Sequence, residues 1–219
     1  MELYHVLNRG VEKRNIFLDD RDRFRFVHGL GLFNTSTPAN NTTYLIEQDH
    51  NDIVSRYEGK RLVNLHGWCL MRNHYHLLLS ERVENGISMF IRKLNIGYAK
   101  YFNKRYDRSG YLFQGRTKKI HVNSEAYFLH IINYVHFNPL DYLQKGRDWR
   151  SRAIQNPAHA HDWLMKYRWS SYSDYCGQKN FPSILTTDLF GETPARFKKH
   201  ISDYSGTGHS ELPVQLLLE

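Results

Sequence analysis

The sequence predicts an α+β protein with a ferredoxin-like, or RNA-recognition-motif-like, fold, in which helices pack on an antiparallel sheet. Three observations predict this class. Patterns along residues 3–137 follow the order strand, helix, strand, strand, helix, strand, helix. The longest helical pattern keeps a period of about 3.6 residues, whereas the strand-like runs are short. A chain of 219 residues, 41% hydrophobic and 24% charged, is long enough to bury a core.

Each element follows from local patterning and turn residues. Strands are predicted at residues 3–8, 61–71, 74–80 and 117–122. Helices are predicted at residues 21–33, 87–106 and 124–137, with weaker patterns at 43–57 and 195–204. Arg72-Asn73 joins two strands as a hairpin, or bends one strand. Asn123 or Ser124 can cap the helix that reaches Phe137. After residue 139 the chain is more polar, with turns predicted at residues 156–157, 181–182 and 193–194.

The net charge indicates the class of binding partner, and the cysteine content indicates the cellular compartment. The formal net charge of +8 and the sequence pI of about 9.4 favour a polyanionic partner, of which nucleic acid is the commonest. Cys69 and Cys176 form no Cys-x-x-Cys motif, which argues against a disulfide scaffold and fits a reducing cytoplasm. No apolar run approaches the ~18 residues of a membrane span, and no signal peptide is apparent.

Two histidines one residue apart predict half of a metal site. In a strand, His74 and His76 point to the same face and offer two imidazoles to a divalent ion. The alternative is one exposed histidine and one hydrogen-bonded core histidine. His159 and His161 have the same spacing in a polar stretch, and we do not expect them to bind a metal.

A tyrosine and an asparagine could complete such a site. Tyr134 and Asn138 share one helix face at i, i+4 spacing, and Pro139 places Asn138 near the helix end. The Asn138 amide oxygen can add a metal ligand, with Mg²⁺ or Mn²⁺ as the ion. A polarised phosphate would suit attack by a tyrosine, which is a poor nucleophile at its ordinary pKa of about 10. Tyr127 lies on about the same face, and either tyrosine can instead be a core residue.

A basic segment extends over residues 92–121 and contains one acid, Asp107. Aromatic residues are interleaved with its cations, which suits binding to a sugar–phosphate backbone, whereas the alternative is a solvated basic face. The predicted DNA-binding cations are Arg92, Lys93, Lys100, Lys104, Arg105, Arg108, Arg116, Lys118 and Lys119.

Six motifs in one order resemble a known family. They are YHVLNRG at 4–10, IFLDD at 16–20, CLMRNHYHLLL at 69–79, RSGYLFQGR at 108–116, YVHFNP at 134–139 and WSSY at 169–172. Together they resemble the single-tyrosine HUH transposases (IS200-like), most closely the REP-associated tyrosine transposase branch. The resemblance covers roughly residues 3–175.

The resemblance implies roles for the site residues. His74 and His76 would be metal ligands, Asn138 the third ligand and Tyr134 the nucleophile. The family cuts single-stranded DNA at hairpin-forming repeats through a 5′-phosphotyrosine intermediate, releases a 3′-hydroxyl and rejoins by the reverse step. This implies a cytoplasmic enzyme, nucleoid-associated when bound to DNA. It does not decide whether the protein is a monomer or a homodimer, or whether Tyr134 acts in cis or in trans.

The resemblance also suggests a division of the chain. Residues 1–140 would form the HUH domain, with an insertion at residues 34–60, and residues 141–219 a C-terminal extension packing on the same domain. Tyr75 replaces the usual aliphatic residue between the two histidines and should point away from the metal. Three alternatives remain: a related replication initiator or relaxase, a metal-dependent hydrolase, and a non-catalytic single-stranded DNA-binding regulator on the same fold.

Overall fold

The computed structural model describes residues 1–37, 60–143, 149–150, 154–190 and 193–206. The helix expected at residues 43–57 and most of the suggested insertion lie outside these ranges. None of the helices in the described ranges is long and apolar enough to cross a membrane.

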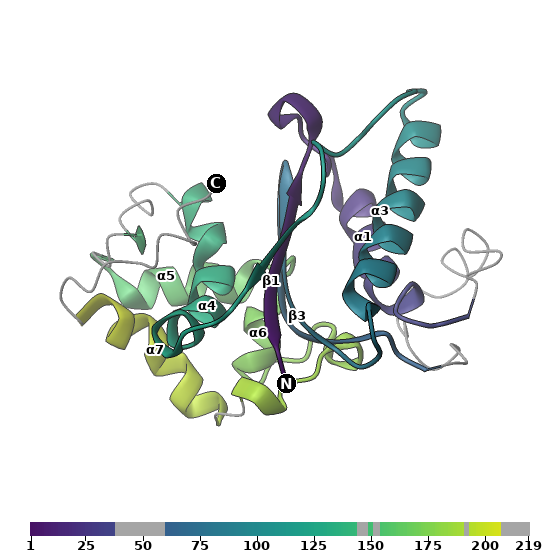
Figure 1. Cartoon of the computed structure of the whole chain (residues 1–219). Helices are drawn as coiled ribbons and strands as arrows, with labels where there is room; N and C mark the ends of the chain where they lie inside the picture. Colours follow the sequence, from purple (N-terminus) through teal and green to yellow (C-terminus); the bar gives the residue numbers. More distant parts are fainter. Residues whose placement is uncertain (38–59, 144–148, 151–153, 191–192, 207–219) are drawn as a thin grey trace.

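A four-stranded antiparallel sheet forms the centre of the molecule (Figure 1). Its strands are β1 (Leu3–Arg9), β2 (Val63–Met71), β3 (His74–Glu81) and β4 (Lys118–His121). They lie in the order β2-β3-β1-β4, so the first and third strands are neighbours at the centre. This order and the succession of elements confirm the α+β, ferredoxin-like prediction.

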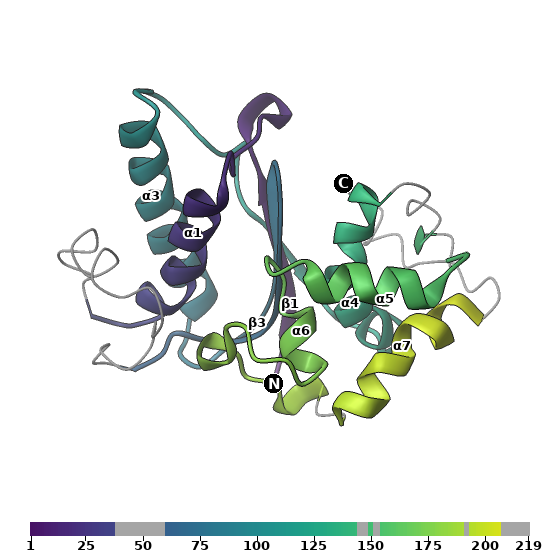
Figure 2. The ribbon, with the colours of Figure 1, turned by 180° about the vertical axis from the view of Figure 1, so that it is seen from behind.

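Helices cover both faces of the sheet (Figures 1 and 2). On one face lie α1 (Asp20–Leu32) and α3 (Gly86–Arg105). On the other lie α4 (Glu125–Phe137), α5 (Pro157–Lys166) and α7 (Pro194–Gly206). Shorter elements are η1 (Val11–Lys13), η2 (Asn138–Tyr142), α6 (Tyr172–Tyr175), η4 (Pro182–Ile184) and η5 (Asp188–Phe190).

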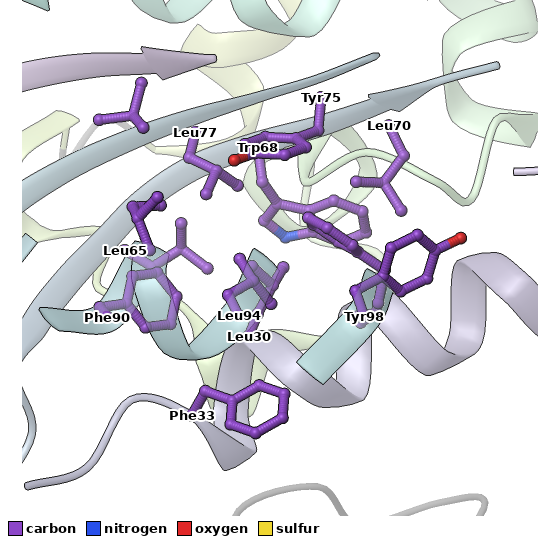
Figure 3. Packing of buried hydrophobic residues seen from close by; sticks show 14 of the residues in the cluster. Leu30, Phe33, Leu65, Trp68, Leu70, Tyr75, Leu77, Phe90, Leu94 and Tyr98 are labelled. Carbon is purple, nitrogen blue, oxygen red and sulfur yellow. The ribbon is translucent and has the colours of Figure 1, made fainter. Parts of the chain in front are cut away.

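The sheet separates two hydrophobic cores. Side chains such as Leu77 and Tyr75 of β3 pack with Leu94 and Tyr98 of α3 in the first core (Figure 3). Leu78 of β3 belongs to the second core, which includes residues of α4, α5 and α7. Strand alternation therefore decides which core each side chain enters.

Strand pairing and helix capping explain which predicted turns and helix ends are confirmed and which are wrong. The hairpin at Arg72-Asn73 is confirmed, because β2 and β3 pair directly on either side of it. Ser124 caps α4, its side chain accepting from the Tyr127 amide. The turns predicted at residues 156–157 and 193–194 are wrong, because α5 begins at Pro157 and α7 at Pro194. Asn156 caps α5, and a proline at its first position needs no amide hydrogen bond.

The position of α4 is fixed by close contacts with β2. A Cβ added at Gly67 would lie 2.9 Å from Cδ1 of Ile132, so glycine permits the close approach of helix and strand. His136 Nε2 forms a 2.7 Å hydrogen bond with Ser171 Oγ, which also accepts from the Trp68 amide at 3.0 Å. The WSSY motif at 169–172 runs along the edge of β2 and pairs with it, so this motif ties α4 to the sheet.

A buried carboxylate joins α1 to α3. Asp22 accepts hydrogen bonds from Leu18 N at 2.8 Å, Tyr101 Oη at 3.0 Å, Tyr106 Oη at 2.8 Å and Arg105 Nη1 at 2.6 Å. Its side chain has no exposed surface. The ion pair with Arg105 therefore stabilises the helical layer on this face of the sheet.

We expect Asp22→Ala to lower the free energy of unfolding by about 3 kcal/mol, because it removes the buried carboxylate of the Arg105 ion pair, leaving only Asp19, and the acceptor of two hydroxyls. Asp20→Ala is the matched control. Asp20 pairs with Arg23 at the exposed start of the same helix, so its loss should cost about 0.5 kcal/mol or less. Urea unfolding followed by circular dichroism measures both, and equal losses would contradict the assignment.

Candidate functional site

The two histidines of the HUH motif lie together on the face of β3 that α4 covers. The ring centroids of His74 and His76 are 4.9 Å apart. Met71, the β2 partner of His74, belongs to the second core, whereas Tyr75 enters the first core. The Tyr75 hydroxyl donates to Asn95 Oδ1 at 2.9 Å. Tyr75 therefore points to the opposite face from the histidine pair, as the sequence predicts.

Tyr134 lies beside this pair within the same chain. Its ring centroid is 5.8 Å from that of His76 and 5.9 Å from that of His5, and both contacts are edge-to-face. Only 1% of the Tyr134 surface is exposed. The spacing of α4 on the sheet thus brings the predicted nucleophile and one predicted metal ligand into contact.

His5 is a site residue that the sequence reasoning missed. Its Nε2 lies 2.9 Å from His76 Nδ1, and its Nδ1 lies 3.3 Å from Tyr127 Oη. The rings of His5 and His76 are stacked, with centroids 5.1 Å apart and planes at 17°. The signal was a histidine at an inward position of a predicted strand, but the pairing of β1 with β3 was needed to place it.

The amide of Asn138 has partners other than the histidine pair. Its Nδ2 donates to the Tyr134 carbonyl at 2.8 Å, and its Oδ1 accepts from Arg150 Nη2 at 3.4 Å. The side chain is buried at the end of α4. Its oxygen has the chemistry of a metal ligand, but in this structure it faces a guanidinium.

Trp149 and Arg150 pack next to Tyr134 and Asn138. The ring centroids of Trp149 and Tyr134 are 5.5 Å apart. Trp149 Nε1 donates to Asp141 Oδ1 at 2.9 Å, and Arg150 forms a two-pronged ion pair with the same carboxylate. The Arg150 guanidinium also lies 4.4 Å from the Trp149 ring. Trp149 thus packs against Tyr134 and Arg150 against Asn138, and Asp141 holds both.

The donor chemistry of the histidine pair fits a divalent ion. Two imidazoles leave the remaining positions of Mg²⁺ or Mn²⁺ to oxygen ligands, such as an amide, water or phosphate. Within the ranges described above, no group of three or more His, Cys, Asp and Glu side chains is arranged to hold a metal. Asn138 would supply an amide oxygen only after Arg150 has moved away from it.

A basic cavity opens next to His74. It has a volume of about 340 Å³, and its lining includes Arg9, Lys13, Arg116 and Lys118 but no acidic side chain. Asn8, Asn73 and Gln114 also line the cavity. Arg9 and Lys13 come from β1 and η1, far in sequence from the predicted basic segment, so the sequence reasoning did not include them.

The other predicted DNA-binding cations are distributed differently. Arg92, Lys100 and Lys104 are exposed on α3, which covers the sheet face opposite to Tyr134. Several cations have partners inside the protein. Lys93 donates to the Thr35 and Thr37 carbonyls, and Arg108 donates to Asn103. Arg105 pairs with Asp19 and Asp22, and Lys119 pairs with Glu81. The structure thus brings only Arg116 and Lys118 of this set to the cavity beside His74.

His159 and His161 lie on α5, not on a strand. Residues two apart on a helix point in different directions, so the spacing does not bring their imidazoles to one face. His161 Nδ1 instead forms a 2.7 Å hydrogen bond with the Tyr172 hydroxyl.

The chain matches the family model described as "Transposase IS200 like" over residues 36–138. This range is just under half of the chain and contains His74, His76, Tyr134 and Asn138. Over this range the chain is similar to the IS200-like transposases.

Two further comparisons complete this picture. A solved structure of a REP-associated tyrosine transposase bound to a REP hairpin is similar over 86% of each chain, with 11% sequence identity and a TM-score of 0.46. No curated protein matches the chain.

The cavity predicts a cation-specific effect on DNA binding. We expect Lys13→Ala/Arg116→Ala to weaken binding of a single-stranded oligonucleotide on the order of tenfold near 0.1 M salt, and to reduce the slope of log K against log salt by about 1.4. Arg92→Ala/Lys100→Ala removes the same charge from α3 and should change the slope little. Fluorescence anisotropy over a salt series measures both, and equal slopes would contradict a role for the cavity.

Proposed function

We propose that this protein is a transposase that nicks and rejoins single-stranded DNA at hairpin-forming repeats through a 5′-phosphotyrosine on Tyr134, as in the REP-associated branch that its motifs resemble. The observation that carries the proposal is the contact of the Tyr134 ring with His76, 5.8 Å between centroids, inside one chain. This contact supports action in cis. It also gives the nucleophile a place beside groups that can hold a divalent ion.

The chemical step is a transesterification. Tyr134 Oη forms a bond to the scissile phosphorus, and the bond from phosphorus to the 3′ oxygen breaks. The phenol loses its proton, and the leaving oxygen gains one to become a 3′-hydroxyl. The reverse attack by a 3′-hydroxyl restores the phosphodiester and the tyrosine. No nucleotide cofactor is required because each step exchanges one phosphate ester for another.

His74 and His76 would hold the divalent ion, Mg²⁺ or Mn²⁺, with Asn138 as the third protein ligand. When bound, the ion supplies positive charge at the phosphate oxygens. The 3.4 Å contact between Asn138 Oδ1 and Arg150 requires that Arg150 leave Asn138 before the third ligand can act. Arg150 then becomes a cation available to a DNA phosphate.

The surroundings of Tyr134 support strand transfer over hydrolysis. The side chain is 1% exposed and is packed against Trp149. A site that excludes water limits hydrolysis of the covalent intermediate. DNA would approach from the cavity at His74 and displace Trp149 and Arg150 to reach the tyrosine.

A second candidate is a regulator that binds single-stranded DNA without cutting it. The same burial of Tyr134, together with the pairing of Asn138 with Arg150, favours this alternative if the two residues stay closed on DNA. The basic cavity would serve either function.

The test uses hairpin DNA from repeats flanking the protein's own gene, labelled in parallel at the 3′ or the 5′ end, with Mn²⁺ or Mg²⁺. We expect the 3′-labelled strand to migrate with the protein on a denaturing gel, and the 5′-labelled strand to yield a free fragment with a 3′-hydroxyl. Tyr134→Phe should abolish both products because it removes the nucleophilic oxygen. His76→Ala should abolish them while retaining DNA binding.

Tyr111→Phe is the matched control, because Tyr111 is 89% exposed and is the most accessible alternative tyrosine described. It should cut like the wild type. Cleavage without a covalent band, unchanged in Tyr134→Phe, would indicate a hydrolase. Tight binding without cleavage by any form would favour the regulator.

A further inference from the structure

We propose that His5, held by Tyr127, is a positioning residue that fixes the tautomer and orientation of His76. This inference rests on the proposed metal site. It assigns a role to a residue of β1 and to the tyrosine that rivals Tyr134 in the sequence.

The contacts form a continuous buried chain. His76 Nδ1 lies 2.9 Å from His5 Nε2, and His5 Nδ1 lies 3.3 Å from Tyr127 Oη. His5 is 2% exposed, and His76 and Tyr127 are fully buried. The stacking of the two rings restricts rotation of His76 about its side-chain bonds. A strand and a helix thus converge on one imidazole.

Proton placement follows from what each atom can do. An imidazole coordinates through a lone pair, so coordination at Nε2 requires the His76 proton to be on Nδ1. That N–H then donates to His5 Nε2, which must be an acceptor. His5 accordingly carries its own proton on Nδ1 and donates to Tyr127 Oη. Ion binding therefore selects one of the two tautomeric arrangements that the geometry allows.

His74 is oriented by a different group. Its Nδ1 lies 2.7 Å from Asn73 Oδ1, which can only accept, so the His74 proton is on Nδ1. The amide orientation of Asn73 is set because its Nδ2 donates to the Lys13 carbonyl at 3.2 Å. Both histidines are thus prepared to coordinate through Nε2. The His74 partner belongs to the hairpin turn, whereas the His76 partners belong to β1 and α4.

Through Tyr127, the chain also links the ligand to the helix that carries Tyr134. Tyr127 and Tyr134 are both on α4, two turns apart, and His5 contacts both. A change in the packing of α4 would therefore alter the orientation of His76 and the position of Tyr134 together.

The test measures Mn²⁺ affinity of the full chain without DNA, from the free-ion signal in electron paramagnetic resonance. We expect His5→Leu to weaken binding by about 10- to 100-fold. His5→Gln should recover most of this loss, because its amide oxygen can accept at the position of Nε2. Tyr127→Phe should give a smaller loss. His121→Leu, an exposed histidine on the neighbouring strand β4, should bind like the wild type.

The outcomes separate the two proposals. If His76→Ala binds Mn²⁺ as well as the wild type does, the proposed metal site fails. If His76→Ala loses the ion and His5→Leu retains wild-type affinity, the metal site stands and the positioning role is overturned. A failure of His5→Gln to recover affinity would also overturn it.

Nitrogen-15 NMR of the wild-type imidazoles with Mg²⁺ tests the tautomers without any substitution. If His5→Leu does not fold, this measurement decides the proposal. We expect His76 and His5 both to be protonated at Nδ1. Protonation of His76 at Nε2 in the ion-bound protein would contradict the proposal.

Discussion

Strand alternation in β3 is the constraint on which the rest of the site depends. His74 and His76 reach the face under α4 only because Tyr75 between them enters the opposite core, where its hydroxyl donates to Asn95 of α3. A slip of one residue would exchange these faces, so that the two imidazoles would enter the first core and Tyr75, Leu77 and Leu79 would face α4. Pairing with β1 on one side and β2 on the other fixes the register of β3 against such a slip.

The second constraint is the distance between α4 and the sheet. The absence of a side chain at Gly67 lets Ile132 approach, and the hydrogen bond between His136 and Ser171 holds the far end of the helix. Burial lowers the pKa of His136 to about 3, so this hydrogen bond is made by a neutral imidazole and adds no charge to the core. Tyr134 lies between these two contacts along the helix, which is why its ring meets His76.

The sequence predicted the fold and most of the candidate site because these depend on short periodicities. The i, i+2 pair in β3 and the i, i+4 pair at the end of α4 are local patterns, and the order of the elements limits the ways in which they can meet. The roles of His5, Arg9 and Lys13 could not be predicted in the same way. They depend on which strands pair and in what register, and that information is distributed over residues far apart in the chain. Arg105 shows the converse case, since it belongs to a basic run but its charge is matched by Asp19 and Asp22 of α1.

The cations on α3 and those at the cavity beside His74 can play different parts in DNA binding. The cations of α3 lie across the sheet from Tyr134, so they add to the long-range attraction of a polyanion but cannot contact a phosphate at the tyrosine. Cations at the cavity beside His74 are close enough to fix the path of a strand. Trp149, which packs against Tyr134, and Arg150, which contacts Asn138, are both held by one carboxylate, Asp141. In the proposed reaction a DNA phosphate offers Arg150 a second anionic partner. Phosphate and Asp141 would therefore compete for the Arg150 guanidinium. Arg150 would leave Asp141 only when DNA is bound, and without DNA Tyr134 would stay buried and protected from water.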